Sequence, residues 1–208
     1  MDMIIAEVSE RITDVLQQLL PWWITLIPIY LAVRGVWLVC RRRRRGFDIS
    51  WLREAGMLLL CVYIIGMLTV TVLPEVYIGS DTVNLYYPGG KIGEEGNCSG
   101  DYLNLLPGNM LITIIRSFQD FQGMSLWWSC FANIALFIPF GALICCLYNW
   151  KISNGILFGA GVSLGIELFQ LLLPRATDID DLLLNTFGML IGYLIGMLCK
   201  SKGSAKIE

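Results

Sequence analysis

Five apolar runs dominate this sequence, and each is about as long as a bilayer's hydrocarbon core is thick. They cover residues 22–40, 55–73, 126–148, 155–173 and 182–199. An α-helix needs about 20 predominantly apolar residues to cross a bilayer. The chain is 56% hydrophobic and only 15% charged, whereas a soluble domain carries about 25% charged residues. We therefore expect an all-α, polytopic membrane bundle with five transmembrane helices.

Residues 1–21, ahead of the first run, have a different pattern. Apolar side chains recur there at helical spacing, with charged side chains such as Glu7 and Arg11 between them. This pattern is typical of an amphipathic helix that lies on a membrane surface or packs against the protein. The segment is acidic and lacks a small-residue cleavage site, so it does not match a secretory signal peptide.

The runs and the polar segments between them predict five regions. These are the amphipathic helix (1–21), two spans joined by a basic cytoplasmic loop (22–73), a long extracytoplasmic loop (74–125), a core of three spans (126–199) and a cytoplasmic tail (200–208). Within the long loop, residues 110–121 could form a short helix or a re-entrant segment. Arg34, near the end of the first span, is long enough to extend its charge to the membrane interface.

The basic residues predict the orientation in the membrane. With five spans, one side receives residues 41–45 (all arginine), Arg53, Lys151, Lys200, Lys202 and Lys206. The other side receives Arg11, Lys91, Arg116 and Arg175. Because cytoplasmic loops carry the excess of Lys and Arg, we expect the N-terminus outside and the C-terminus in the cytoplasm. The arginine block also resembles a patch for nucleic acid or anionic lipid, but directly after an apolar run it is typical of a stop-transfer signal. No nucleic-acid partner is expected.

The composition also narrows the chemistry. The chain contains no histidine, which removes the commonest general base, a Ser-His triad and the usual zinc ligand. Six of the seven cysteines lie in or beside apolar runs, and only Cys98 lies in a long polar loop. No disulfide framework or CxxC metal motif is recognisable, and no cofactor is expected.

One span carries polar side chains on a single face. Ser163, Glu167 and Gln170 are spaced i, i+4 and i+7, so they form one stripe along a helix. At about 1.5 Å per residue, Glu167 lies roughly 9 Å, Asn133 roughly 10 Å and Asn185 roughly 5 Å below the outer ends of their spans. This agreement predicts one outward-opening pocket lined by three helices.

Glu167 is the residue of this set that points most directly to function. Ionisable groups inside a membrane span are costly and by default mark a functional site, so Glu167 is the candidate catalytic residue. Asn133, Ser163 and Gln170 have a simpler alternative, as hydrogen-bonding contacts between helices. Close helix packing is predicted by glycines repeated every four residues, at Gly155/Gly159, Gly161/Gly165 and Gly188/Gly192/Gly196.

The loop before the last span would roof this pocket with Arg175, Asp178, Asp180 and Asp181. Aspartates just ahead of a helix are good N-caps, and one of the three is expected to have only that role. Three carboxylates also suit Mg²⁺ or Ca²⁺. Their spacing does not match an EF-hand loop, so it gives little support for a metal site.

Three segments together resemble the VanZ family in order and spacing: 133–141 (NIALFIPFG), 163–170 (SLGIELFQ) and 175–188 (RATDIDDLLLNTFG). The resemblance extends over residues 126–199 and carries over Asn133, Glu167, Gln170, Arg175, Asp178, Asp180, Asp181 and Asn185 as motif residues. The family's best-known member is associated with resistance to teicoplanin, a lipid-tailed glycopeptide antibiotic. The resemblance therefore implies a bacterial inner-membrane protein that acts at the cell surface, and it implies no particular reaction.

Two functions of different classes stay open. The first is binding of an amphipathic molecule, a membrane lipid or a lipid-linked cell-wall molecule, by the motif residues together with Ser163. The second is an intramembrane enzyme, with Glu167 as general acid/base and the aspartates positioning a metal or water. A transporter is a third reading, but no inverted repeat is visible.

Overall fold

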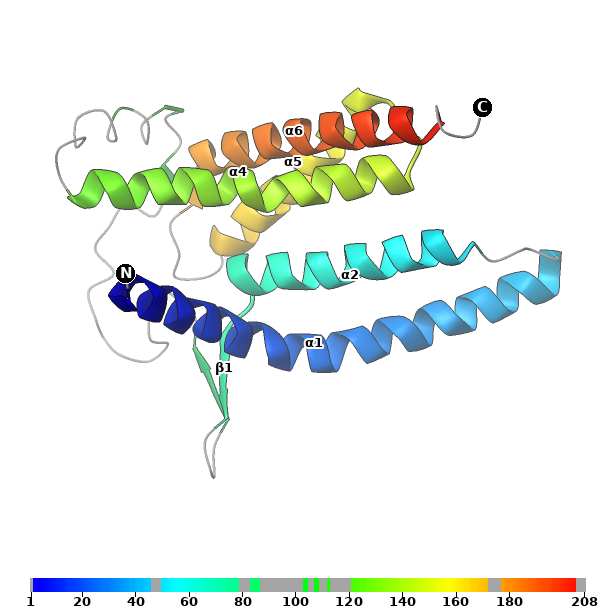
Figure 1. Cartoon of the computed structure of the whole chain (residues 1–208), viewed down its shortest axis with the longest axis horizontal. Coiled ribbons are helices and arrows are strands. Elements are labelled where there is room, and N and C mark those ends of the chain that lie inside the picture. Colours follow the sequence, from blue (N-terminus) through cyan, green and yellow to red (C-terminus); the bar gives the residue numbers. More distant parts are fainter. Residues whose placement is uncertain are drawn as a thin grey trace. The chain divides into compact units, whose positions relative to one another are not determined.

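The computed structural model describes residues 2–45, 50–78, 83–86, 103–104, 107–108, 112, 121–171 and 177–204. Within them, five helices are long and apolar enough to cross a membrane, which confirms the all-α membrane bundle (Figure 1). The spans are Leu16–Arg43, Trp51–Thr71, Trp127–Leu147, Ile152–Leu171 and Ile179–Lys200. The chain divides into two compact units, Met1–Ile92 and Gly93–Glu208. The suggested helix at 110–121 lies largely outside the described residues.

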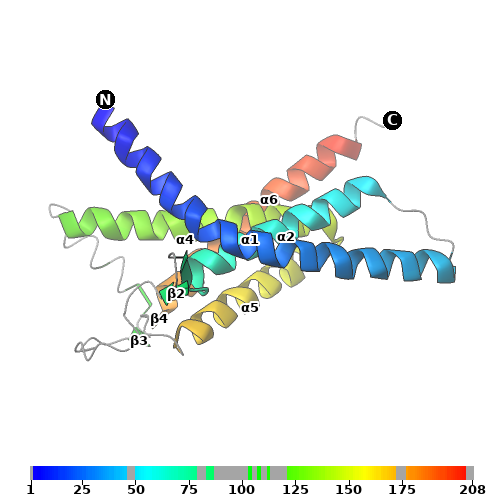
Figure 2. The same ribbon diagram turned by 90° about the horizontal axis from the view of Figure 1, so that it is seen from below.

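The first unit is built on two antiparallel helices, α1 (Asp2–Arg45) and α2 (Trp51–Thr71). The sequence separates an amphipathic helix at 1–21 from a span that begins at 22, but α1 runs through both, with Pro21 and Pro28 inside it. A proline inside a helix removes one backbone hydrogen bond and kinks the chain, and membrane helices tolerate it. Figure 2 shows the resulting bend in the N-terminal half of α1.

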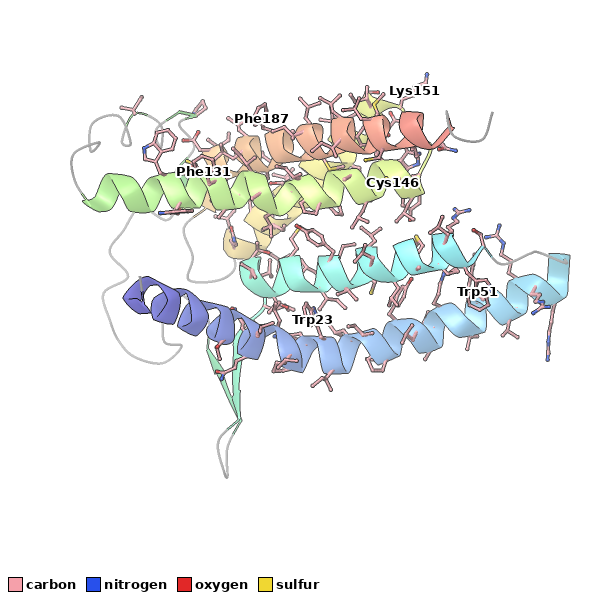
Figure 3. All side chains as sticks on the ribbon, in the orientation of Figure 1. Trp23, Trp51, Phe131, Cys146, Lys151 and Phe187 are labelled. Atoms are coloured by element: carbon pink, nitrogen blue, oxygen red, sulfur yellow. The ribbon has the colours of Figure 1, made fainter. Side chains whose placement is uncertain are left out.

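Side chains of α1 hold α2 at both ends. The Arg34 guanidinium forms a two-pronged ion pair with Glu54, with N–O distances of 2.8 and 2.9 Å. Arg34 therefore pairs within the unit, an arrangement that the sequence did not indicate. Toward the other end, the Trp22 indole N–H donates to the Pro74 carbonyl at 3.1 Å. Trp23, labelled in Figure 3, lies beside Gly66 of α2.

Two short strands follow α2 inside the segment that the sequence assigns to a loop. Strand β1 (Glu75–Ile78) pairs antiparallel with β2 (Val83–Tyr86), in a register that places Glu75 opposite Tyr86 and Ile78 opposite Val83. They belong to the first unit and leave the helical fold class unchanged.

The second unit is a three-helix core made of α4 (Phe121–Leu147), α5 (Ile152–Leu171) and α6 (Ile179–Ser204). Helices α4 and α6 lie side by side and run in the same direction, while α5 runs back across them (Figures 1 and 2). Two residues of the preceding segment, β3 (Leu103–Asn104), pair in parallel with β4 (Thr177–Asp178), just ahead of α6.

Glycine explains how closely α6 approaches α4. A Cβ atom at Gly188 or Gly192 would collide with the carbonyl oxygen of Ile134 or Ile138, one turn apart on α4. At Gly196 it would lie 3.0 Å from the Ala142 carbonyl oxygen and 2.7 Å from the Cβ of Cys145. The α4 backbone thus occupies the space that side chains would need, as small-xxx-small faces permit.

Helix α5 has a second glycine face, against which side chains of α6 pack. The Met189 side chain fills the space beside Gly159, and the Tyr193 ring fills the space beside Gly155. The sequence prediction is thus confirmed for Gly155/Gly159 and Gly188/Gly192/Gly196. It is wrong for Gly161 and Gly165, where a Cβ atom would meet nothing within 4 Å in the described part of the chain.

Many apolar side chains on the outer faces of the helices are exposed. Phe131 on α4 and Phe187 on α6, labelled in Figure 3, are 60% and 53% exposed. Extensive exposed apolar surface marks contact with lipid or with another protein. It fits helices that cross a membrane.

Candidate functional site

A buried polar contact joins α5 to α6 in the second unit. The Asn185 amide Nδ2 donates to the Ser163 hydroxyl at 2.9 Å. Ser163 is 0% exposed and Asn185 is 4% exposed, so the contact is buried. The other amide atom, the Asn185 Oδ1 oxygen, is buried without a hydrogen-bond partner among the described residues.

Glu167 lies one turn further along the same face of α5. It is 5% exposed, and its Oε2 atom accepts a hydrogen bond of 3.3 Å from the backbone N–H of Asp178. It also lies close enough to Asp181 for their negative charges to interact. The carboxylate predicted from sequence is therefore buried at the start of α6.

Asn133 connects α4 to the same place, because its amide nitrogen donates a hydrogen bond to the Asp181 carboxylate. Asp181 and Asn185 lie one turn apart on α6, as Ser163 and Glu167 do on α5. We call these five residues, Asn133, Ser163, Glu167, Asp181 and Asn185, the polar cluster.

Asp178 and Asp180 order the start of α6. The Asp178 carboxylate accepts the backbone N–H of Asp180 at 2.9 Å, two residues on, which is the geometry of an N-cap. The prediction that one aspartate caps this helix is confirmed. Asp180 is 6% exposed and accepts the backbone N–H of Gly108 at 2.6 Å.

The Gly108 contact was missed from the sequence. Gly108 has φ +84°, which favours glycine, and it follows Pro107. A Pro-Gly pair is a strong turn signal, so the turn itself was recognisable. Its contact with Asp180, 72 residues away, was not.

The structure gives less information on the two remaining predicted residues, Gln170 and Arg175. Gln170 lies partly buried on α5, three residues beyond Glu167. Arg175 lies outside the described residues. In the described part of the chain, no three Asp, Glu, Cys or His side chains are grouped so that they could hold a metal ion.

An apolar layer borders the polar cluster on the side toward the C-terminal end of α6. One turn along each helix from the cluster lie Phe137, Gly159 and Met189, and Phe137 and Met189 are 0% exposed. Phe140 and Tyr193 follow at 1% and 2%. Tyr193 carries the next hydroxyl, and it donates to the Trp150 carbonyl at 2.7 Å. The cluster is thus bounded by packed side chains toward the C-terminal end of α6.

The contacts between the helices change the order expected along α6. The apolar runs put Asn185 nearer the outer end than Glu167, but Asn185 contacts Ser163, one turn before Glu167 on α5. The reason is that α6 begins at Ile179 rather than at 182. The apolar run leaves out the polar first turn of the helix, so each residue of α6 lies about one turn further from the start of its helix than the run suggests.

Comparison with known proteins assigns the chain to a family. No curated protein and no solved structure matches the chain significantly. A model of the VanZ/LLP1 family matches residues 60–200. The match covers all of α4, α5 and the polar cluster, and it begins inside α2, earlier than the 126–199 resemblance. The chain is a multi-pass membrane protein that belongs to the VanZ/LLP1 family.

Proposed function

We propose that the polar cluster binds the head of an amphipathic molecule of the bacterial cell envelope, either a membrane lipid or a lipid-linked cell-wall molecule. By this route the protein would protect the cell against lipid-tailed glycopeptide antibiotics of the teicoplanin type. The observation that carries the proposal is the buried Glu167, which sits with Asp181, Asn133, Ser163 and Asn185 above a packed apolar layer. A site closed at one end suits binding better than passage through the bundle.

The distribution of basic residues supports a cluster that faces outward. Lys151 and Lys200 lie at the far ends of α5 and α6 from the cluster, beside the predicted cytoplasmic side. Under the positive-inside rule the cluster end would then face outside, with the N-terminus outside and the C-terminus in the cytoplasm. In this orientation an envelope molecule reaches Glu167 from the outer leaflet.

Each part of the site has a separate role in this proposal. Glu167 and Asp181 supply negative charge, and Asp178 and Asp180 fix the start of α6. Arg175, in the loop just ahead, would bind an anionic group of the ligand with a charge-assisted hydrogen bond. Exposed apolar side chains of the helices would contact the tail.

A second candidate is an enzyme that modifies such a molecule. It is favoured by one observation, the closeness of the carboxylates of Glu167 and Asp181, because paired carboxylates can share general acid and base roles. Glu167 would then be the general acid/base.

The two functions are separated by incubating the purified protein with wall precursors and envelope lipids, with and without EDTA. Binding is measured by calorimetry and products by mass spectrometry. We expect binding without turnover, and we expect EDTA to have no effect. Binding should be lost in Glu167→Gln and kept in Asp2→Asn. New products from any of these molecules, absent with Glu167→Gln, would establish the enzyme instead.

A further inference from the structure

The polar cluster contains one buried acceptor without a hydrogen-bond partner. Three hydrogen bonds are made inside the site: the Asn133 amide donates to Asp181, the Asn185 amide donates to Ser163 and the Asp178 N–H donates to Glu167. The Asn185 Oδ1 oxygen, by contrast, is buried and has no partner among the described residues.

A buried acceptor without a partner costs free energy, since it has given up water and gained nothing in return. Native structures leave few such atoms, and those that remain call for an explanation. Asn185 is 4% exposed, so the bulk solvent does not supply the missing donor. A bound group with an N–H or O–H would.

The negative charges near this oxygen further limit which donor group could bind there. Asp181 lies one turn before Asn185 on α6, and Glu167 lies one turn after Ser163, the hydroxyl that the same amide contacts. Asp181 and Glu167 are close enough for their charges to repel, and Asp178 and Asp180 add negative charge beside Asp181. Like charges at short range in a poorly solvated site are unfavourable. A positive charge between them would remove the repulsion.

We propose that the cluster recognises a primary ammonium group carried by the amphipathic ligand. An ammonium has three donors and one positive charge, so it can donate to Asn185 Oδ1 and to the carboxylates of Glu167 and Asp181 together. The apolar layer at Phe137 and Met189 limits how deeply it enters. This inference rests on the proposed function and names the head group of its ligand.

The test compares three amphiphiles with one tail: dodecylammonium, dodecyltrimethylammonium and dodecyl phosphate. Dodecyltrimethylammonium keeps the charge and the tail and has no N–H. Each is titrated by calorimetry into purified full-length protein in maltoside micelles, with empty micelles as the blank. We expect dodecylammonium to bind about tenfold tighter than dodecyltrimethylammonium, which is the effect of one hydrogen bond to a charged group.

Variants locate the preference. Asn185→Leu removes the unpartnered oxygen, and we expect it to abolish the tenfold preference. Thr186→Val is the matched control, because the Thr186 hydroxyl bonds to the Leu182 carbonyl of its own helix. If Asn185→Leu fails to fold, Asp181→Asn is a second test variant. It should weaken dodecylammonium binding and leave dodecyl phosphate binding unchanged.

The outcomes separate this inference from the proposed function. Equal binding of both ammonium amphiphiles, a preference that survives in Asn185→Leu, or competition by sodium chloride as strong as by methylammonium chloride would overturn the ammonium site. Binding of dodecyl phosphate alone would do the same and leave amphiphile binding standing. If none of the three binds more tightly to the wild type than to Glu167→Gln, the proposed function fails as well.

Discussion

Gly192 of α6 lies directly against the carbonyl oxygen of Ile138 on α4, in a contact that leaves no room for a side chain. Its neighbours Gly188 and Gly196 repeat the contact one turn away on either side. This backbone-to-backbone approach holds Asn133 of α4 within hydrogen-bonding distance of Asp181 of α6. The glycine face therefore determines the geometry of the polar cluster.

Gly192→Ala is expected to destabilise the protein. The added methyl group meets backbone atoms, which cannot rotate away as a flexible side chain can, and overpacking of this kind costs about 1–3 kcal/mol. Thermal unfolding in detergent measures the loss. Gly161→Ala is the matched control, since a Cβ atom there meets nothing within 4 Å and Ala favours the helix. Equal stability of the two variants would show that α4 and α6 are further apart than described.

The Arg34–Glu54 pair gives a prediction for the first unit. Arg34→Met leaves a partly buried carboxylate without its partner, and removing one member of such a pair is strongly destabilising. The double variant Arg34→Met with Glu54→Met is expected to recover most of the stability. A double-mutant cycle by thermal unfolding measures the coupling, and additive losses would mean that the two residues act independently.

The contact of Asp180 with the Gly108 N–H predicts how the segment before α4 is held. Asp180→Ala removes the acceptor and should increase proteolytic cleavage near 107–108, whereas Asp180→Asn keeps an oxygen at that position and should have a smaller effect. Limited proteolysis followed by mass spectrometry of the fragments compares them. The same cleavage rate in both variants and in the wild type would contradict a role for this bond.

Local patterns predicted much of this fold, because they depend on residues close in sequence. Apolar runs indicated five spans, and the repeats at Gly155/Gly159 and Gly188/Gly192/Gly196 indicated the faces of α5 and α6 that pack. The aspartates before α6 indicated a cap, which Asp178 provides. Hydropathy failed where polarity and helix structure differ, at the polar first turn of α6 and across Pro21 in α1.

Contacts between residues far apart in the sequence could not be predicted from local patterns. Ser163 and Asn185 were assigned to one site, but their direct bond follows from how α5 crosses α6. The pairing of β3 with β4 and the Gly108–Asp180 bond depend on where a long connecting segment returns. Arg34 and Glu54 lie in different helices, and neither position alone indicates a pair.

Orientation in the membrane can be tested with cysteine chemistry. The positive-inside rule predicts that Cys98 faces outward and that Cys40, Cys146 and Cys199 lie near the cytoplasmic side. An impermeant thiol reagent on intact cells should therefore label a variant that keeps only Cys98. A variant that keeps only Cys199 should be labelled only after lysis. The reverse pattern would place the polar cluster on the cytoplasmic side.

The central claim is that the buried Glu167 carboxylate carries the function, and the most direct test is the teicoplanin inhibitory concentration of cells that express the wild type or Glu167→Gln. The substitution keeps the shape of the side chain and removes its charge. The account predicts that the wild type raises this concentration and that Glu167→Gln, present in the membrane at equal amount, returns it to the level of cells without the protein. Asp2→Asn should behave as the wild type. Protection by Glu167→Gln equal to that of the wild type would contradict the account.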